Sequence, residues 1–118
     1  MLERIYTYCM AKKAVTEGFP FGESVLVFKV AGKMFALVAI EEIPLRVNLK
    51  CDPEKAVELR EQYAYVIPGY HMNKQQWNTV IMEGEVPDRE FFSWIDDSYD
   101  LIVASLTKKK RIEFGFDA

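Results

Sequence analysis

The spacing of apolar and polar residues changes several times along this chain, and each change marks a predicted element. Apolar side chains recur every three or four positions over residues 2–14, which predicts an amphipathic helix. Two apolar, β-branched runs follow at residues 25–30 and 34–40, and the turn residues Ala31-Gly32-Lys33 between them predict a hairpin. The second run is the more apolar of the two, so we expect it to lie in the middle of a sheet.

Residues 45–50 alternate strictly between apolar and polar side chains, as in a strand with one buried and one solvent-facing side. The apolar positions are Leu45, Val47 and Leu49. The polar positions are Arg46, Asn48 and Lys50. This alternation predicts an antiparallel sheet that is covered on one face only.

The second half of the chain begins with a helix signal. Asp52 can accept the free amide groups of a first helical turn, and Pro53 is tolerated at the first helical position. A helix should therefore run to about Gln62. Residues 65–70 and 77–82 are predicted to be strands, the first of them short.

Two helices are predicted after these strands. Pro87-Asp88 should open the first, with Asp88 as its cap. Asp97-Ser98 has the character of a second capping site, so we expect the helix to break there. A new helix should then span residues 99–108.

The order of these elements, α-βββ-α-ββ-αα, predicts a two-layer α+β domain. It should contain an antiparallel sheet of about five strands with helices packed on one face. The length of 118 residues suits a single domain over residues 1–118. The side chains expected to be largely buried are Leu37, Val47, Leu49, Leu59, Ile95, Ile102 and Leu106.

Composition and charge narrow the class of protein. Hydrophobic residues make up 50% of the chain, which is typical of a folded globular domain. A net charge of −3 weighs against non-specific coating of nucleic acid, although a local basic patch remains compatible with it. The two cysteines, Cys9 and Cys51, are too far apart in sequence for a disulfide framework or a zinc knuckle. With no signal-peptide pattern and no apolar run near the ~20 residues that span a bilayer, we expect a cytoplasmic protein without membrane contact.

Residues 68–79 gather aromatic and hydrogen-bonding side chains in one predicted loop. The segment holds the only histidine of the chain. Aromatic rings beside amide and ammonium donors on a loop are typical of a binding site. The candidate ligand-binding residues of this segment are Tyr70, His71, Asn73, Lys74 and Trp77.

His71 has two interpretations. It titrates near neutral pH, so it can bind an anion or move a proton. The alternative, which we favour, is a loop histidine that bonds to backbone, because no local motif supplies a nucleophile or an orienting carboxylate. A metal site of His71, Cys51 and Asp52 is conceivable, but these ligands are scattered and Asp52 is better explained as a helix cap. We therefore predict no catalytic residue, no metal and no cofactor.

The polar side of the predicted sheet supplies a second set of candidates. Basic and amide groups there, with the rings of Tyr70 and Trp77 as stacking planes, are the ingredients of a nucleic-acid site. The alternative, a solvated sheet face beside a core tryptophan, is the interpretation that we favour. The basic and amide residues of this set are Lys29, Lys33, Arg46, Asn48, Lys50 and Lys74.

Six short segments carry a family resemblance. They are Phe19–Gly22, Gly32–Leu37, Leu49–Glu54, Pro68–Lys74, Trp77–Val80 and Asp97–Leu101. Together, and in this order, they resemble the MmcQ/YjbR family of small bacterial proteins over nearly the whole chain. The resemblance implies an antiparallel sheet backed by helices, similar in layout to type III secretion chaperones and frataxin-like domains. Family members are described as having a double-wing, DNA-binding-like architecture, so DNA is the ligand that the resemblance suggests, by fold analogy.

We therefore expect a non-enzymatic binding protein with DNA as its suggested ligand. Two alternatives stay open. One is a chaperone-like adaptor that binds another protein or itself, and the other is a small-ligand binder or enzyme centred on His71. The acidic net charge favours the adaptor over DNA, whereas the donors gathered in residues 68–79 favour DNA or a small ligand over the adaptor.

Overall fold

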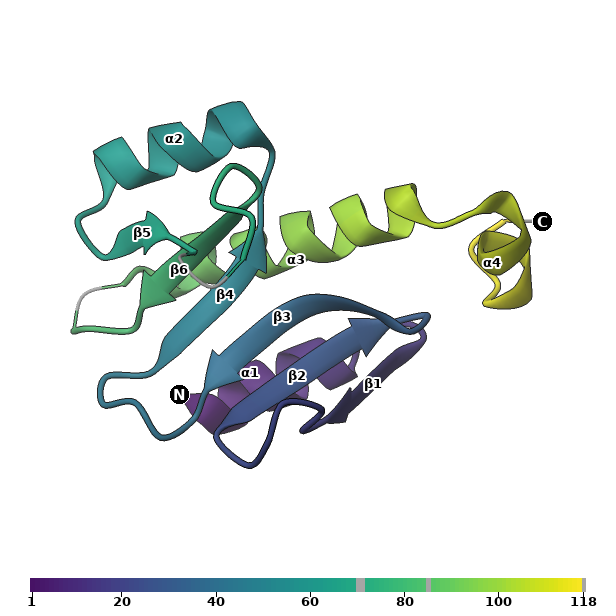
Figure 1. Ribbon diagram of the computed structural model, residues 1–118, viewed down its shortest axis with the longest axis horizontal. Coiled ribbons are helices and arrows are strands. Elements are labelled where there is room, and N and C mark those ends of the chain that lie inside the picture. Colours follow the sequence, from purple (N-terminus) through teal and green to yellow (C-terminus); the bar gives the residue numbers. More distant parts are fainter. Residues whose placement is uncertain (70–71, 85, 118) are drawn as a thin grey trace.

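The protein folds as one antiparallel sheet with helices packed against a single face (Figure 1). The computed structural model describes residues 1–69, 72–84 and 86–117. The sheet has six strands in the order β1-β2-β3-β4-β6-β5, and every neighbouring pair is antiparallel. The elements are α1 (Leu2–Met10), β1 (Val15–Gly18), β2 (Val25–Val30), β3 (Lys33–Ala39), β4 (Arg46–Lys50), α2 (Pro53–Gln62), β5 (Val66–Pro68), β6 (Trp77–Ile81), α3 (Asp88–Ser105) and α4 (Lys108–Glu113). The predicted α+β class is confirmed.

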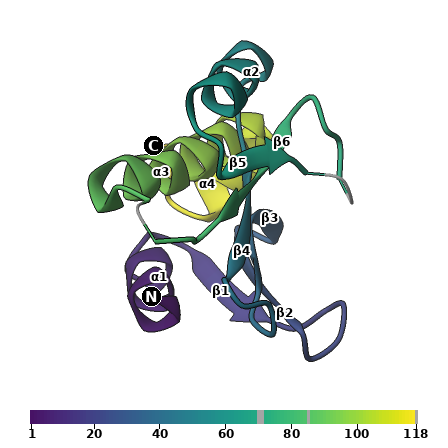
Figure 2. The ribbon, with the colours of Figure 1, turned by 90° about the vertical axis from the view of Figure 1, so that its left-hand side faces the viewer.

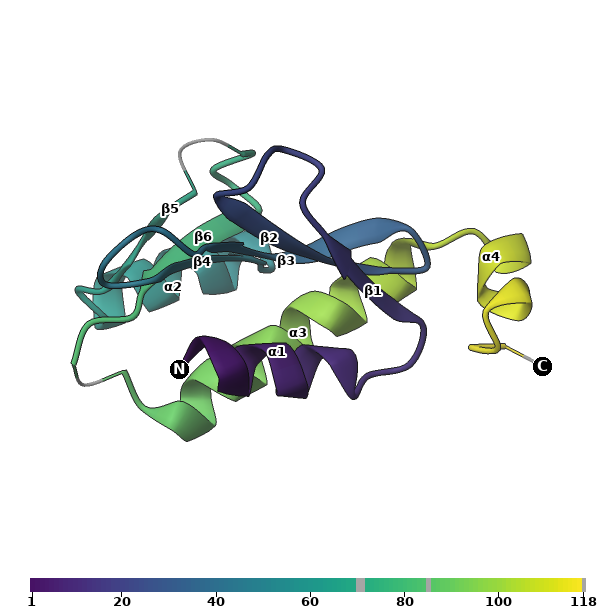
Figure 3. The same cartoon turned by 90° about the horizontal axis from the view of Figure 1, so that it is seen from below.

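The main core lies between the sheet and three of these helices. Figures 2 and 3 show α1 and α3 on the same side of the sheet. Ala56 and Leu59 of α2 join the same buried cluster, together with Ile5 of α1 and Phe91 of α3. Among the described residues, no helix covers the opposite face (Figure 3), which we call the open face.

The predicted core residues are buried, each exposing 9% or less of its surface. Val47 and Ile95 are fully enclosed in the main core. Leu37 is the exception in position, because it packs with Val27 and Trp77 in a smaller cluster on the open face. The sheet therefore carries apolar side chains on both sides.

The start of α2 is as predicted. The Asp52 carboxylate accepts the backbone N–H groups of Glu54 and Lys55 at 3.2 and 3.4 Å, and Pro53 occupies the first helical position. Capping removes two of the unpaired amides at the helix start. Asp52 is thus the cap of α2 that the sequence predicts.

The sheet is one strand larger than the sequence predicted. Val15–Gly18 forms β1 at the edge, pairing with β2 from Val15↔Val30 to Gly18↔Val27. The sequence pattern predicts a helix over residues 2–14 and no strand before residue 25, but α1 ends at Met10. Ala14 follows with φ of 61°, a left-handed conformation that cannot continue a helix. Such a short edge strand has too few alternating positions to be recognised by its pattern.

The predicted break at Asp97-Ser98 is wrong, because α3 runs without interruption from Asp88 to Ser105. Asp97 forms an ion pair with Lys55 of α2 at 2.9 Å, and the Ser98 hydroxyl bonds to the sheet. Both side chains therefore make tertiary contacts instead of capping a new helix. Asp88 is likewise not the cap, since Pro87 holds that position.

The helix predicted over residues 99–108 does not reach Lys108, because Lys108 begins a separate helix, α4. Thr107 caps α4, and its hydroxyl accepts the N–H of Lys110 at 3.2 Å. In the described part of the chain, no helix is long and apolar enough to cross a membrane.

Candidate functional site

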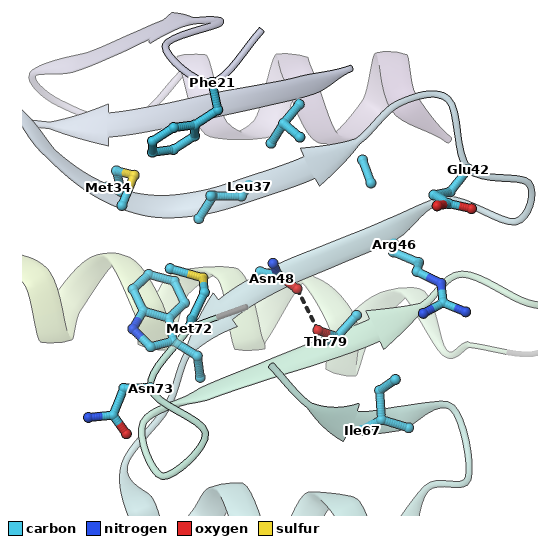
Figure 4. A pocket seen from close by; sticks show the side chains of 13 residues that line it. Phe21, Met34, Leu37, Glu42, Arg46, Asn48, Ile67, Met72, Asn73 and Thr79 are labelled. Carbon is cyan, nitrogen blue, oxygen red and sulfur yellow. Dashed lines mark hydrogen bonds between the residues drawn. The ribbon is translucent and has the colours of Figure 1, made fainter. Parts of the chain in front are cut away.

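A hollow of about 560 Å³ lies on the open face of the sheet. Figure 4 shows the side chains that line it, which come from β2, β3, β4, β5, β6 and three loops. The lining residues are Phe21, Val25, Met34, Leu37, Ala39, Glu42, Arg46, Asn48, Ile67, Met72, Asn73, Trp77 and Thr79. Most of these side chains are apolar, and the polar ones are few and separated.

Strand register explains why these residues meet. Leu37 pairs with Asn48 across β3 and β4, and Asn48 pairs with Thr79 across β4 and β6. Directly paired residues of antiparallel strands point to the same face of the sheet. One row across three strands therefore places Leu37, Asn48 and Thr79 side by side on the floor of the hollow.

Trp77 forms part of the wall and is only 9% exposed. It packs with Val27 and Leu37, and the half-buried side chain of Met72 lies against this group. The polar side of β4 is consequently less open to solvent than its alternation suggested, and Asn48 is half-buried. We favoured a solvated sheet face beside a core tryptophan. Trp77 is buried as expected, but the sheet face around Asn48 is only partly solvated.

The loop before Trp77 is held in place by backbone contacts. The N–H of Gly69 donates to the Trp77 carbonyl at 2.9 Å, and the N–H of Met72 donates to the Gly69 carbonyl at 3.0 Å. A Cβ at Gly69 would lie 3.1 Å from both the Cβ and the carbonyl oxygen of Trp77, so any larger residue would have to displace Trp77 by a few tenths of an ångström. From the helical side, the Arg60 guanidinium donates to the Lys74 carbonyl at 3.1 Å and to the Asn78 side chain at 2.8 Å. These bonds fix Met72 and Asn73 at one end of the hollow.

Three polar side chains of the hollow, those of Asn48, Asn73 and Arg46, have donor groups that the described residues do not use. The Thr79 hydroxyl donates to Oδ1 of Asn48 at 2.5 Å, and no described residue accepts the two N–H groups of the Asn48 amide. Asn73 accepts the N–H of Gln75 on its Oδ1, and its amide N–H groups likewise have no acceptor among the described residues. Arg46 makes no ion pair or side-chain hydrogen bond with the residues that the structure describes.

The predicted candidates are divided by the fold. Arg46, Asn48, Asn73 and Trp77 come together in the hollow. Four others do not line it: Lys29, Lys33, Lys50 and Lys74. Tyr70 and His71 lie outside the described residues.

The lysines of the predicted basic surface are dispersed. The Lys33 ammonium donates to the Ser105 hydroxyl at 2.9 Å, which directs it toward the end of α3 and away from the hollow. Lys50 ends β4 opposite Trp77, and Lys29 lies in β2 beyond Val27. Lys74 is exposed on the loop that Arg60 anchors. Two of these side chains, those of Lys29 and Lys50, thus extend the open face beyond the hollow.

Sequence reasoning missed the apolar members of the site other than Trp77, and its acidic member. Phe21, Met34 and Ile67 come from segments that read as turns or core strands, and nothing in their spacing separates a pocket wall from a core. Glu42 lies in the loop between β3 and β4. Its only signal in the sequence is the acidic pair Glu41-Glu42.

The conceivable metal site of His71, Cys51 and Asp52 includes a residue that lies outside the described part of the chain, so only Cys51 and Asp52 can be placed. Cys51 is buried, and burial is the main cause that raises the pKa of its thiol. Within residues 1–69, 72–84 and 86–117, no three histidine, cysteine or carboxylate side chains form a group that could hold a metal ion. Cys51 therefore behaves as a small apolar core residue.

Comparison with known proteins places these features in a family. The YjbR family model matches residues 10–101. The uncharacterized protein YjbR of Escherichia coli K12 is 34% identical over 110 residues, covering 93% of each chain. The uncharacterized protein YbdF of Escherichia coli O157:H7 is 38% identical over 100 residues, covering 82% of this chain and 81% of the relative.

Solved structures show the same fold. The Deinococcus radiodurans protein DR2400, with a DUF419 family-model domain, matches with a TM-score of 0.92 and 37% identity, over 98% of this chain and 88% of that one. A Pseudomonas syringae protein matches with a TM-score of 0.73 and 28% identity, over 84% of this chain and 96% of that one. These similarities confirm the fold and extend across nearly the whole length of the relatives.

Proposed function

This chain belongs to the YjbR family, and we propose that it is a non-enzymatic binding protein whose small ligand occupies the hollow on the open face of the sheet. Small-molecule sites are usually concave, about 300–1,000 Å³ in volume, mainly apolar and furnished with a few polar groups. The hollow has a volume of about 560 Å³ and this same composition.

The observation that carries the proposal is the pairing of an apolar wall with unused donors. Leu37, Trp77 and Met72 offer a surface on which a hydrophobic or aromatic group can be buried. Arg46 and the Asn48 amide, beside this wall, have donors that the described part of the chain does not use. A site with both features can bind and orient a ligand without any group that performs a reaction.

The family resemblance supports the same location. Four of the six segments that carry it contribute side chains to the hollow, and they come from three separate parts of the sequence. Their contributions are Phe21; Met34 and Leu37; Met72 and Asn73; and Trp77 and Thr79.

The test uses anilinonaphthalene sulfonate, an aromatic anion that fluoresces in apolar surroundings. We expect saturable binding to the wild-type protein. Ala39→Phe places a ring in the hollow and should weaken binding about tenfold or more, because the added side chain occupies the ligand's space. Ala64→Phe is the matched control, since Ala64 is exposed and does not line the hollow. Unchanged binding in the Ala39 variant would overturn the proposal.

DNA is the second candidate function. The observation in its favour is that Lys29 and Lys50 flank the hollow on the same face as Arg46, where they can contact phosphates around a base. Affinity for a single-stranded oligonucleotide should then fall steeply with salt. Lys50→Gln or Lys74→Gln should lower the log–log salt slope by about one unit each. If the folded protein does not bind the oligonucleotide at low salt, DNA binding is excluded and small-ligand binding remains as the proposed function.

A further inference from the structure

We propose that the ligand of the hollow is a free α-amino acid with a large apolar side chain, held by its ammonium at Glu42 and its carboxylate at Arg46. This inference rests on the proposed function and names the class of ligand. It comes from the only two charged residues of the described chain that line the hollow, which have opposite signs.

Glu42 and Arg46 occupy the same end of the hollow. Figure 4 shows both side chains beside the β3–β4 loop, whereas Met34, Met72 and Asn73 lie at the opposite end. Arg46 opens β4 directly after this loop, which contains Glu42. One short stretch of chain therefore presents a carboxylate and a guanidinium to the same part of the ligand.

The two charges are not satisfied by each other. Ion pairs among the described residues join Arg4 to Asp88, Lys12 to Asp96, Lys55 to Asp97 and Arg111 to Asp117, and include neither Glu42 nor Arg46. Both side chains are exposed, and neither makes a side-chain hydrogen bond with another described residue. A ligand can thus place charged groups against each without breaking a contact of the protein.

Opposite charges at one end select a zwitterion. A simple carboxylate would gain from Arg46 but meet repulsion from Glu42, and a simple amine would meet the reverse. An α-amino acid carries both charges on one carbon, so it is complementary to both residues at once. The guanidinium can also bind a carboxylate through two parallel hydrogen bonds.

The rest of the hollow suits the side chain of such a ligand. Leu37 and Trp77 form an apolar wall beyond the charged end, and Met34 and Met72 continue it. Methionine side chains are flexible and make favourable contacts with aromatic rings. The Asn48 amide, between the two ends in Figure 4, can donate to the ligand carboxylate from the side opposite Arg46.

Three probes separate the contributions of the two charges. L-Phenylalanine carries both, phenylpropionate lacks the ammonium, and phenethylamine lacks the carboxylate. Isothermal titration with wild-type protein should show L-phenylalanine binding about tenfold more tightly than either analogue, because each loses one charge-assisted contact.

Two variants assign each contact to its residue. In the Glu42→Gln variant, L-phenylalanine should no longer bind more tightly than phenylpropionate. In the Arg46→Gln variant, L-phenylalanine should no longer bind more tightly than phenethylamine. Glu41→Gln is the matched control, because Glu41 is exposed in the same loop but does not line the hollow. Circular dichroism verifies that every variant is folded.

The outcomes separate this inference from the proposed function. Equal affinity for L-phenylalanine and either analogue, no binding of L-phenylalanine, or indifference to both variants overturns the amino-acid assignment. If anilinonaphthalene sulfonate binding remains sensitive to Ala39→Phe in those cases, the small-ligand function stands without it. If that sensitivity is also missing, the function itself fails.

Discussion

The hydroxyl of Ser98 in α3 donates a hydrogen bond of 2.6 Å to the carbonyl of Phe35 in β3, 63 residues earlier in the chain. The same hydroxyl accepts the backbone N–H of Lys50 in β4 at 2.9 Å. The β3–β4 register ends at Ala36↔Leu49, so Phe35 and Lys50 would form the next pair. Ser98 therefore stands between two strands where their ladder stops, and it ties the longest helix to the centre of the sheet.

Replacing Ser98 with alanine should destabilise the protein by about 1–3 kcal/mol, because a buried carbonyl and a backbone N–H lose their partner together. Chemical denaturation measures the difference. Ser93→Ala is the control: its hydroxyl bonds only within α3, to the Glu90 carbonyl, and is exposed, so little change is expected. If both substitutions lowered the free energy of unfolding equally, the two hydrogen bonds of Ser98 to β3 and β4 would add no stability beyond that of an exposed serine.

Gly69→Ala tests the close approach that shapes the loop of the hollow. The added methyl group would meet Trp77 at 3.1 Å, so either the loop shifts or the bond from Gly69 to the Trp77 carbonyl lengthens. We expect a loss of about 1–3 kcal/mol in the free energy of unfolding. Gly18→Ala is the matched control, since no atom lies within 4 Å of a Cβ there. A Gly69 variant as stable as the Gly18 variant would contradict the tight packing.

Cys9 should make stability fall at alkaline pH. Burial raises the pKa of its thiol from the ordinary 9.0 to about 12, with Asp96 acting in the same direction and Lys12 against it. Above pH 9 the unfolded thiol ionises while the folded one keeps its proton. The contribution of Cys9 is therefore fully present below pH 9.0 and is lost as the pH rises to about 12.

Cys9→Ala should flatten this decline when the free energy of unfolding is measured across that pH range. A smaller decline should remain, because burial and the hydrogen bonds to Asp96 also raise the pKa of Tyr8 to about 12. Parallel curves for the variant and the wild-type protein would count against a role for the Cys9 thiol.

Short-range sequence patterns were sufficient to predict part of the fold. The cap at Asp52, the proline after it and the alternation over residues 45–50 predicted α2 and β4, because each depends on interactions within a few residues. Ser98 shows the opposite case. Its side chain suits a helix cap, and only the distant strands β3 and β4 decide that it bonds elsewhere.

The candidate site was predictable in part of its polar half and, on the apolar side, in Trp77. Arg46 and Asn48 were identified from their position opposite the apolar face of a strand, and both line the hollow. Leu37 was correctly expected to be buried, but its pattern does not tell on which side of the sheet. That depends on the pairing of β3, β4 and β6, which brings residues from separate segments into one row.

Trp77 should report ligand binding while Trp94 does not. Trp77 lines the hollow on the open face, and Trp94 lies in the main core on the helical side, where its ring meets that of Tyr63 at 5.3 Å. Each indole N–H gives its own signal in a nitrogen-resolved NMR spectrum of the labelled protein. Titration with anilinonaphthalene sulfonate should shift the Trp77 signal and leave that of Trp94 in place, because the sheet separates the two rings. The two tryptophan-to-phenylalanine variants assign the signals. Movement of the Trp94 signal alone would place the ligand on the helical side and contradict a site on the open face.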